Sequence, residues 1–336
     1  MNLQKISFGL VLAMLLVLGF SPNAQAQNAY RISAPITHKN LSVFLIHGKN
    51  ELIGENILTL QEAMEQKILV VYETSDVNEL LVQNKSTKYE VFIQSGDIVK
   101  GGKQDRVLSV DIIIPIRSGK ISIEAFCVES GRWEQRSGEN VGEFSSSNER
   151  IVTRELKLAA NKSRSQSEVW KEVEKTQNKL SDNVGATVKS KSSRTSLQLS
   201  LENKEVMATT DEFVKKLSGI INGKTDVIGY AFVINGKINS ADVYASNFLF
   251  KKLWLKLLKA TAVEAVSEMK EARIARVVTA NDIKAFLDGA DLAKSEERAV
   301  TDRVRAVTRE DKETIVFESR DTKTKVTLHK SYVRKQ

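Results

Sequence analysis

Cysteine is almost absent from this sequence. Among its 336 residues only Cys127 is a cysteine. One cysteine cannot form a disulfide within the chain, so the fold has to be stabilised by its hydrophobic core. A chain of this length can build such a core, since it buries roughly three quarters of the surface that the unfolded chain exposes.

Signatures of metal and cofactor sites are also missing. The three histidines, His38, His47 and His329, do not have the spacing of metal ligands. Neither a Gly-x-Ser-x-Gly elbow nor a glycine fingerprint for dinucleotide binding occurs in the sequence. We therefore expect neither a metal nor a cofactor.

Long apolar runs are confined to the N-terminus. Residues 8–20 (FGLVLAMLLVLGF) follow Lys5 and are too short for a stable membrane span. Ala24-Gln25-Ala26 then places small residues at both positions that a signal peptidase reads. The pattern predicts a signal peptide over 1–26, cleaved at Ala26–Gln27, with an uncleaved anchor as the alternative. The expected product is exported, periplasmic or secreted, and has no integral membrane segment.

The chain is basic, but its positive charge is not concentrated in one segment. The net charge is +8, the charges of both signs are mixed along the chain, and only 6% of the residues are aromatic. No nucleic-acid recognition motif accompanies the charge. A solvated basic surface is therefore expected, and nucleic acid is not an expected partner.

The first half of the expected product has the pattern of strands. Short β-branched runs separated by turn residues predict an antiparallel β-rich domain over 27–140. One helix is predicted over residues 59–66, with Thr59 as its N-cap and Glu62 in the capping-box position.

The second half mixes helices and strands. A linker and helix are predicted over 141–164, and an α+β domain over 165–336. The second domain contains a hairpin that turns through Asn235-Gly236, and a mobile Ser/Lys-rich loop over 181–196. The predicted fold class is α+β, with the β-rich N-terminal domain packed on a C-terminal domain of helices and a β-hairpin.

Glycine and charged residues are densest between residues 96 and 133. The turn Gly101-Gly102-Lys103-Gln104-Asp105-Arg106 joins two predicted strands, and its amides with Lys103 and Arg106 could bind an anion. A plain hairpin with solvated charges is the equal alternative. Cys127 shares the buried side of the next strand and is expected to be inert.

The end of that strand carries a second group of polar residues. Glu129, Arg132 and Trp133 follow it, where an arginine could grip a phosphate or carboxylate and a tryptophan could stack on a ring.

The sequence resembles the ARPP-1 family, the ADP-ribosylglycohydrolase- and rhodanese-phosphatase-associated protein domain. The residues that carry the resemblance are 58–63, 101–106 with Pro115, 127–133, Gln166 with Val169-Trp170, Gly236, 242–244 and 252–254. The resemblance implies a role near ADP-ribose or nucleotide-derived phosphoesters, by analogy and without a mechanism.

Three hypotheses follow for the function. The first is a ligand-binding or accessory domain for an anionic ligand such as ADP-ribose or a nucleotide, and its expected site consists of Lys103, Gln104, Arg106, Glu129, Arg132 and Trp133. The second is a hydrolase acting on such a ligand, with Glu129 as the candidate catalytic base. The third is a structural envelope protein with a protein partner, in which Arg132 is buried against Glu129 with no cavity beside them.

Overall fold

The computed structural model describes residues 30–335 except 53, 55, 137 and 272–276. The predicted signal peptide over 1–26 lies outside these residues. Within them, no helix combines the length and the apolar character needed to cross a membrane. The described chain is α+β, as the sequence predicts.

The largest element is a nine-stranded antiparallel sheet. Its order is β1-β3-β13-β14-β18-β17-β16-β15, and β2 also pairs with β3. The strands are β1 (Arg31–Ile32), β2 (Ile36–His38), β3 (Leu41–His47), β13 (Val227–Ile234), β14 (Lys237–Tyr244), β15 (Ser295–Ala299), β16 (Val304–Glu310), β17 (Thr314–Asp321) and β18 (Thr327–Arg334).

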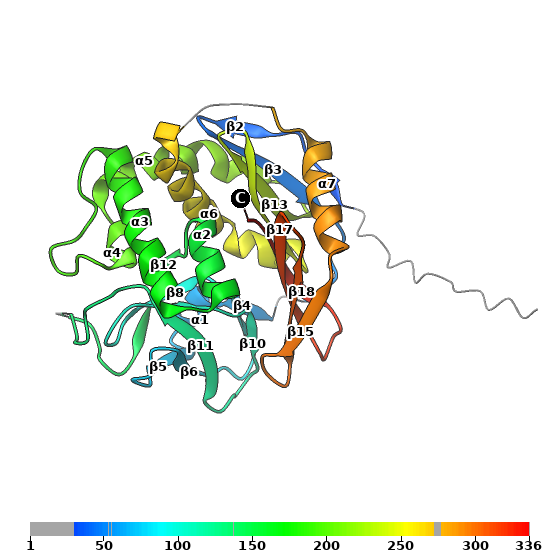
Figure 1. Ribbon diagram of the computed structural model, residues 1–336. Coiled ribbons are helices and arrows are strands. Elements are labelled where there is room, and N and C mark those ends of the chain that lie inside the picture. The colour runs from blue at the N-terminus through cyan, green and yellow to red at the C-terminus, as the bar shows by residue number, and fades with distance from the viewer. Residues whose placement is uncertain (1–29, 53, 55, 137, 272–276, 336) are drawn as a thin grey trace, which may run out of the picture.

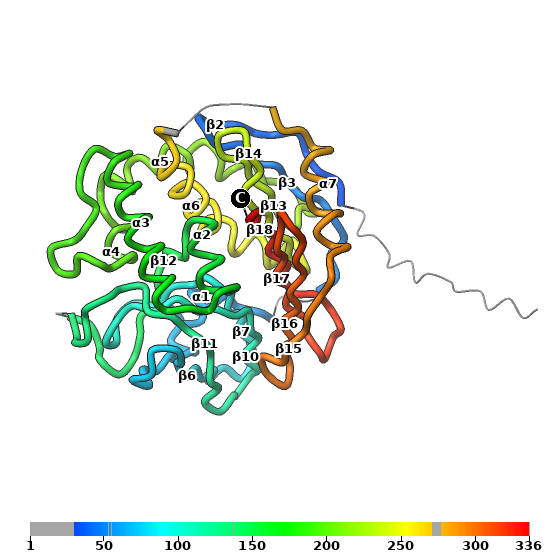
Figure 2. The backbone as a smooth tube through the Cα atoms, in the orientation of Figure 1, coloured from blue at the N-terminus to red at the C-terminus, as the bar shows by residue number. Residues whose placement is uncertain are grey.

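The N-terminal strands belong to this sheet, which crosses the predicted division of the chain. Leu45 of β3 pairs with Tyr230 of β13, and the blue N-terminal strands lie beside β13 in Figure 2. β3 buries both of its faces, with Leu45 in one apolar cluster and Phe44 in another. Such a strand is placed in the middle of a sheet, and sequence alone does not say which sheet. The division into domains over 27–140 and 165–336 stays a prediction.

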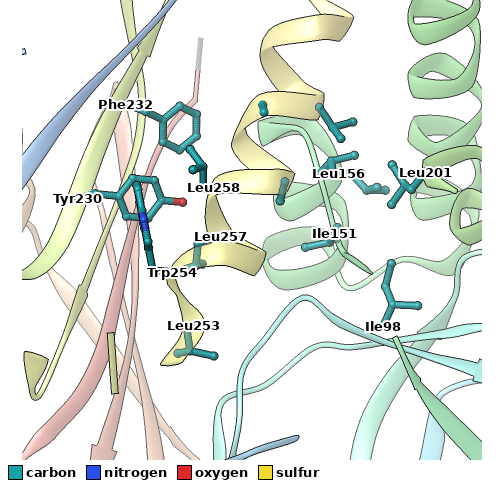
Figure 3. Close-up of a cluster of buried hydrophobic side chains, with 14 of the residues drawn as sticks. Ile98, Ile151, Leu156, Leu201, Tyr230, Phe232, Leu253, Trp254, Leu257 and Leu258 are labelled. Carbon is teal, nitrogen blue, oxygen red and sulfur yellow. The ribbon is translucent and has the colours of Figure 1, made fainter. Parts of the chain in front are cut away.

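Helices cover both faces of the large sheet (Figure 1). On one face lies α6 (Asn247–Ser267), and on the other lies α7 (Ala280–Asp291). Figure 3 shows Leu257 and Leu258 of α6 near Tyr230 and Phe232 of β13. The other helices after residue 150 are α2 (Arg154–Leu158), the π-helix η1 (Ala159–Ser163), α3 (Gln166–Val184), α4 (Leu197–Leu201), α5 (Lys204–Leu217) and the 3-10 turns η2 (Ser218–Ile221) and η3 (Met269–Glu271).

Two smaller sheets form the other end of the molecule. The six-stranded sheet has the order β12-β8-β9-β11-β6-β5, and the three-stranded sheet has the order β10-β7-β4, in which β4 and β7 are parallel. Their elements are β4 (Ile57–Thr59), α1 (Leu60–Glu65), β5 (Leu69–Glu73), β6 (Glu79–Asn84), β7 (Glu90–Ile93), β8 (Asp97–Gly101), β9 (Arg106–Leu108), β10 (Ile112–Ile114), β11 (Ile121–Cys127) and β12 (Phe144–Arg150). The predicted capping box of Thr59 and Glu62 is present in α1.

Two predicted irregular segments contain regular structure. β12 pairs with β8 inside the predicted linker, because Phe144 lies in the core of the small sheets. α3 continues to Val184, four residues into the predicted loop over 181–196, and Val188 beyond it is buried. Polar composition hid both features, since few apolar side chains are enough to anchor a segment that other elements already surround.

Candidate functional site

The predicted site forms where the β8–β9 turn meets the end of β11. Gly101 and Gly102 make this turn with φ of 111° and 54°, a region that favours glycine. A Cβ on Gly102 would lie 2.5 Å from Cζ of Phe144, so the turn also needs the missing side chain. Just beyond the paired strands β9 and β11, the Val128 amide donates to the Asp105 carbonyl over 3.0 Å. The two motifs that lie far apart in the sequence are thereby brought together.

Gln104, Arg106 and Glu129 of the predicted site lie inside the protein, with at most 2% of each residue exposed. Gln104 Nε2 donates to the carbonyl oxygen of Glu129 over 2.8 Å. The Asp105 amide donates to Glu129 Oε2 over 3.3 Å. The carboxylate of Glu129 is therefore buried and accepts a hydrogen bond from the backbone of the turn.

Four charged residues surround Glu129, and we call Asp105, Glu129, Arg132, Arg136 and Glu139 together the arginine cluster. Nη2 of Arg132 lies 2.8 Å from Oε2 of Glu129. Nη2 of Arg136 lies 2.5 Å from Oδ1 of Asp105 and 2.7 Å from Oε1 of Glu139. The side chains of Arg132 and Arg136 are only 8% and 9% exposed. Each guanidinium is thus occupied by carboxylates of the same chain.

Carboxylates outnumber guanidinium groups in the arginine cluster, three to two. Burial, and then repulsion from Glu129, raise the pKa of Asp105. Repulsion from Glu129 thus adds to the effect of burial, while the charge and the hydrogen bond of Arg136 act in the opposite direction.

Glu129 has the electrostatics of an ion-pair partner. Burial acts to raise the pKa of Glu129, but hydrogen bonds from Arg132 and Ser193 and the charges of Arg132 and Arg136 outweigh it, and the pKa is lowered. A general base works best with a pKa near the operating pH and with access to its substrate. Glu129 has neither property.

Arg106 and Cys127 form a second buried contact beside the cluster. Nη1 of Arg106 donates to Sγ of Cys127 over 2.6 Å, and Nη2 lies 3.5 Å from Oε1 of Glu73. Burial raises the pKa of the Cys127 thiol to about 11, against the attraction of Arg106. A protonated, buried thiol is inert, as the sequence predicts for this position.

Lys103 and Trp133 lie on the outside of the predicted site. Nζ of Lys103 is 5.4 Å from the centre of the Trp133 ring, a cation–π distance. Trp133 is 48% exposed. The structure therefore unites Gln104, Arg106 and Glu129 with Arg132 in a buried network and leaves these two residues at the surface.

Sequence reasoning missed Asp105, Arg136 and Ser196 as members of this network. Asp105 lies inside the glycine-rich turn, and Arg136 follows Arg132 by four residues, so both carried a weak signal. Ser196 carried none, since its hydroxyl reaches Asp105 Oδ2 over 3.0 Å from the segment before α4.

Another buried charged group lies at the junction of the large sheet with the smaller ones. Nδ1 of His329 is 2.8 Å from Asp111 Oδ2, and its Nε2 is 3.1 Å from Asp242 Oδ1. Burial acts to lower the pKa of His329, but the two carboxylates raise it to about 9. The charged His329 of β18 therefore links Asp242 of β14 to Asp111 in the loop before β10. Among the described residues no group of three or more His, Cys, Asp and Glu side chains could hold a metal ion.

Two cavities lie away from the predicted site, on the large sheet near α7. Their volumes are about 530 and 830 Å³, and none of the six predicted site residues lines either of them.

Comparison with known proteins gave one match. A protein-family model described as "ARPP-1: ARG and Rhodanese-Phosphatase-superfamily-associated Protein domain" matches residues 29–333. Neither the curated proteins nor the solved structures contain a significant match.

Proposed function

The chain belongs to the ARPP-1 family, which confirms the resemblance seen in its motifs, and on this premise we propose that it is an exported, non-catalytic accessory protein. In this proposal the arginine cluster holds the fold together, and the protein acts by binding. The family takes its name from its association with the ADP-ribosylglycohydrolase and rhodanese-phosphatase superfamilies. That association suggests a supporting role beside enzymes and gives no reaction to this chain.

Export is supported by the N-terminal pattern. The family match begins at residue 29, just beyond the predicted cleavage site at Ala26–Gln27. Mass spectrometry of the protein recovered from producing cells tests this part of the proposal. An N-terminus at Gln27 is expected, and a chain that retains Met1 would contradict cleavage.

One observation carries the structural role: the charges of the arginine cluster are largely buried, and each guanidinium lies within ion-pair distance of the carboxylates. The cluster joins the β8–β9 turn to the segment after β11 through Arg136 and Asp105. Ser196 and Thr195 extend it to α4, since Thr195 Oγ1 donates to the Ser130 carbonyl and Ser196 Oγ to Asp105. The network therefore ties the six-stranded sheet to the helical layer.

An anionic ligand fits this network poorly. Adding Arg106 and Glu73 to the arginine cluster gives three guanidinium groups against four carboxylates. A phosphate placed there would have to displace carboxylates that already hold the arginines, and it would leave those carboxylates buried and unpaired. Such a displacement costs several kcal/mol for each unpaired charge, about 3 to 5 kcal/mol in measured cases.

The decisive experiment uses Glu129→Gln, which keeps the shape of the side chain and removes its charge. Hydrolysis of ADP-ribose conjugates and phosphoesters is measured together with the melting temperature. We expect no turnover by either protein and a lower melting temperature for the variant, because Arg132 loses its partner. Turnover by the natural protein that Glu129→Gln abolishes would overturn the proposal and establish the hydrolase.

A second function, binding of an anionic ligand such as ADP-ribose at the cluster itself, is favoured by one observation. Arg132 Nε and Glu129 Oε1 are buried and have no hydrogen-bond partner within the described chain, and Trp133 nearby is exposed. A ligand could supply the missing partners. Stabilisation by ADP-ribose that disappears in Trp133→Ala, a surface change, would favour this function over the first.

A further inference from the structure

The cavity of about 530 Å³ is built at one end of the large sheet. The sheet runs antiparallel, so the end of β3, the start of β18 and the end of β17 all lie at this end of the sheet. The last turn of α7 forms a wall through Asp291, and Leu292 follows it at the rim. The volume lies within the range of about 300 to 1,000 Å³ that is usual for small-molecule sites.

Most charges in this cavity are already paired. Lys330 Nζ lies 2.9 Å from Asp291 Oδ1. Glu318 is shared by two arginines, with Arg309 Nε at 2.5 Å from Oε1 and Arg320 Nη2 at 2.9 Å from Oε2. A single buried carboxylate therefore serves two guanidinium groups, and among all the side chains that line the cavity five cations stand against four carboxylates.

The surplus positive charge faces solvent. Lys49 and Lys325 line the cavity, are exposed, and form no ion pair within the described residues. Arg320 is partly exposed and donates one side-chain hydrogen bond there, to Glu318. Its remaining N–H groups are available to an incoming acceptor. Two further carboxylates line the cavity. Asp288 is paired with Lys284, whereas Glu51 lacks an ion pair in the described chain.

Part of the cavity wall is apolar. Ile228 and Val243 line it from the sheet, and Leu292 lines it while 78% exposed. Tyr30 adds a ring, and burial together with the negative charges of Asp291, Glu51 and Glu318 raises the pKa of its hydroxyl. The hydroxyl therefore stays protonated and able to donate. A pocket that joins an apolar wall to unpaired cations suits a molecule with both characters.

Gly48 preserves this space. A Cβ at Gly48 would lie 2.5 Å from Cδ1 of Ile228 and 3.3 Å from the Tyr30 ring. Any side chain at this position would press on Ile228 and Tyr30, two of the residues that line the cavity.

The geometry points to a binding site for a small organic anion with an aromatic or apolar part. Its phosphate or carboxylate lies by Arg320 and Lys325, and its apolar part lies against Tyr30 and Leu292. Arginine and lysine form charge-assisted hydrogen bonds with such groups. This inference deepens the proposed function by giving the accessory protein its ligand site, and it stands apart from the arginine cluster.

Calorimetric titration of the purified protein with three probes tests the site. Phenyl phosphate carries both features, inorganic phosphate carries the charge, and phenol carries the ring. Phenyl phosphate is expected to bind more tightly than either of the others. Equal binding of phenol, or no binding of phenyl phosphate, overturns the inference.

Two variants with a matched control locate the binding. Lys325→Gln and Arg320→Gln are each expected to weaken phenyl phosphate about tenfold, the effect of one charge-assisted hydrogen bond. Lys323→Gln changes an exposed lysine of the same turn that does not line the cavity, and it should bind as the natural protein does. Binding that none of these changes affects, or that all three weaken equally, places the anion elsewhere.

The outcomes separate this inference from the proposed function. If phenyl phosphate does not bind and no hydrolysis is detected, the cavity site is disproved and the structural role of the arginine cluster is unaffected. If hydrolysis occurs and depends on Glu129, the proposed function is disproved. The binding data for Arg320→Gln and Lys325→Gln still decide whether the cavity site exists.

Discussion

The arginine cluster and the cavity near α7 are both rich in charged residues, yet their charges are used differently. In the cluster, Arg132 and Arg136 are buried and held by carboxylates. In the cavity, Lys49 and Lys325 are exposed and have no ion pair in the described residues. Buried pairs that satisfy one another leave little to bind with, whereas exposed, unpaired cations beside an apolar wall can recognise a ligand. Pairing and exposure therefore tell more about function than the density of charged residues.

The largest expected effect is at Arg136. Arg136→Ala removes the cation closest to Asp105 and Glu139 and leaves them, within the described chain, only the more distant Arg132, at 3.8 and 3.9 Å. It also removes a charge that offsets the repulsion between Asp105 and Glu129. The free energy of unfolding should fall by about 3 to 5 kcal/mol, as for other broken buried pairs. Urea denaturation measures it, with Lys103→Ala as the surface control. A loss as small as that of the control would remove the distinction between the two regions.

His329 should behave as the arginine cluster does, since it too is buried and paired. Its pKa is about 9 in the folded protein, above the ordinary 6.5, so the contribution is complete below pH 6.5. It is lost as the pH rises through 9, and it amounts to about 3 kcal/mol. Denaturation between pH 6 and 10 should show this decline, and His329→Gln should flatten it. An unchanged slope in the variant would contradict the assignment.

Gly102 tests how tightly the turn of the cluster is packed. Gly102→Ala combines a positive φ with a contact of 2.5 Å to Phe144, whereas Gly131→Ala has the positive φ with open space around it. The first should cost about 1 to 3 kcal/mol more than the second, because only the first overpacks its surroundings. Melting temperatures of the two variants decide this, and equal values would show that the turn has room to move.

The smallest stability effect is expected in the cavity. Lys325→Gln and Lys49→Gln should change the free energy of unfolding by less than about 0.5 kcal/mol, since both lysines are exposed and unpaired in the described chain. The same urea denaturation measures both. A loss of more than 1 kcal/mol, beyond the usual range for surface changes, would give the cavity lysines a structural role and blur the comparison.

Local signals in the sequence predicted local structure well. The capping box of Thr59, the hairpin through Asn235 and the burial of Cys127 are all present. Each depends on residues that are neighbours in the chain. The strands β15, at the edge of the large sheet, and β16 beside it were missed, because their many charged residues resemble a loop.

Long-range arrangements could not be predicted in the same way. The motif of residues 101–106 indicated a charged site, but its pairing with Arg136 and Ser196 depends on how distant segments pack. The cavity is assembled from residues as far apart as Tyr30 and Lys330, and it has no sequence signature at all.

The central claim, that the arginine cluster stabilises the fold by itself, is tested most directly by a double-mutant cycle. Arg136→Ala, Asp105→Asn and their combination are compared by urea denaturation without any ligand. The account predicts a coupling energy above about 1 kcal/mol, as for buried residues in direct contact. A coupling near zero that becomes large only when ADP-ribose is added would contradict the account and return the cluster to the role of a ligand site.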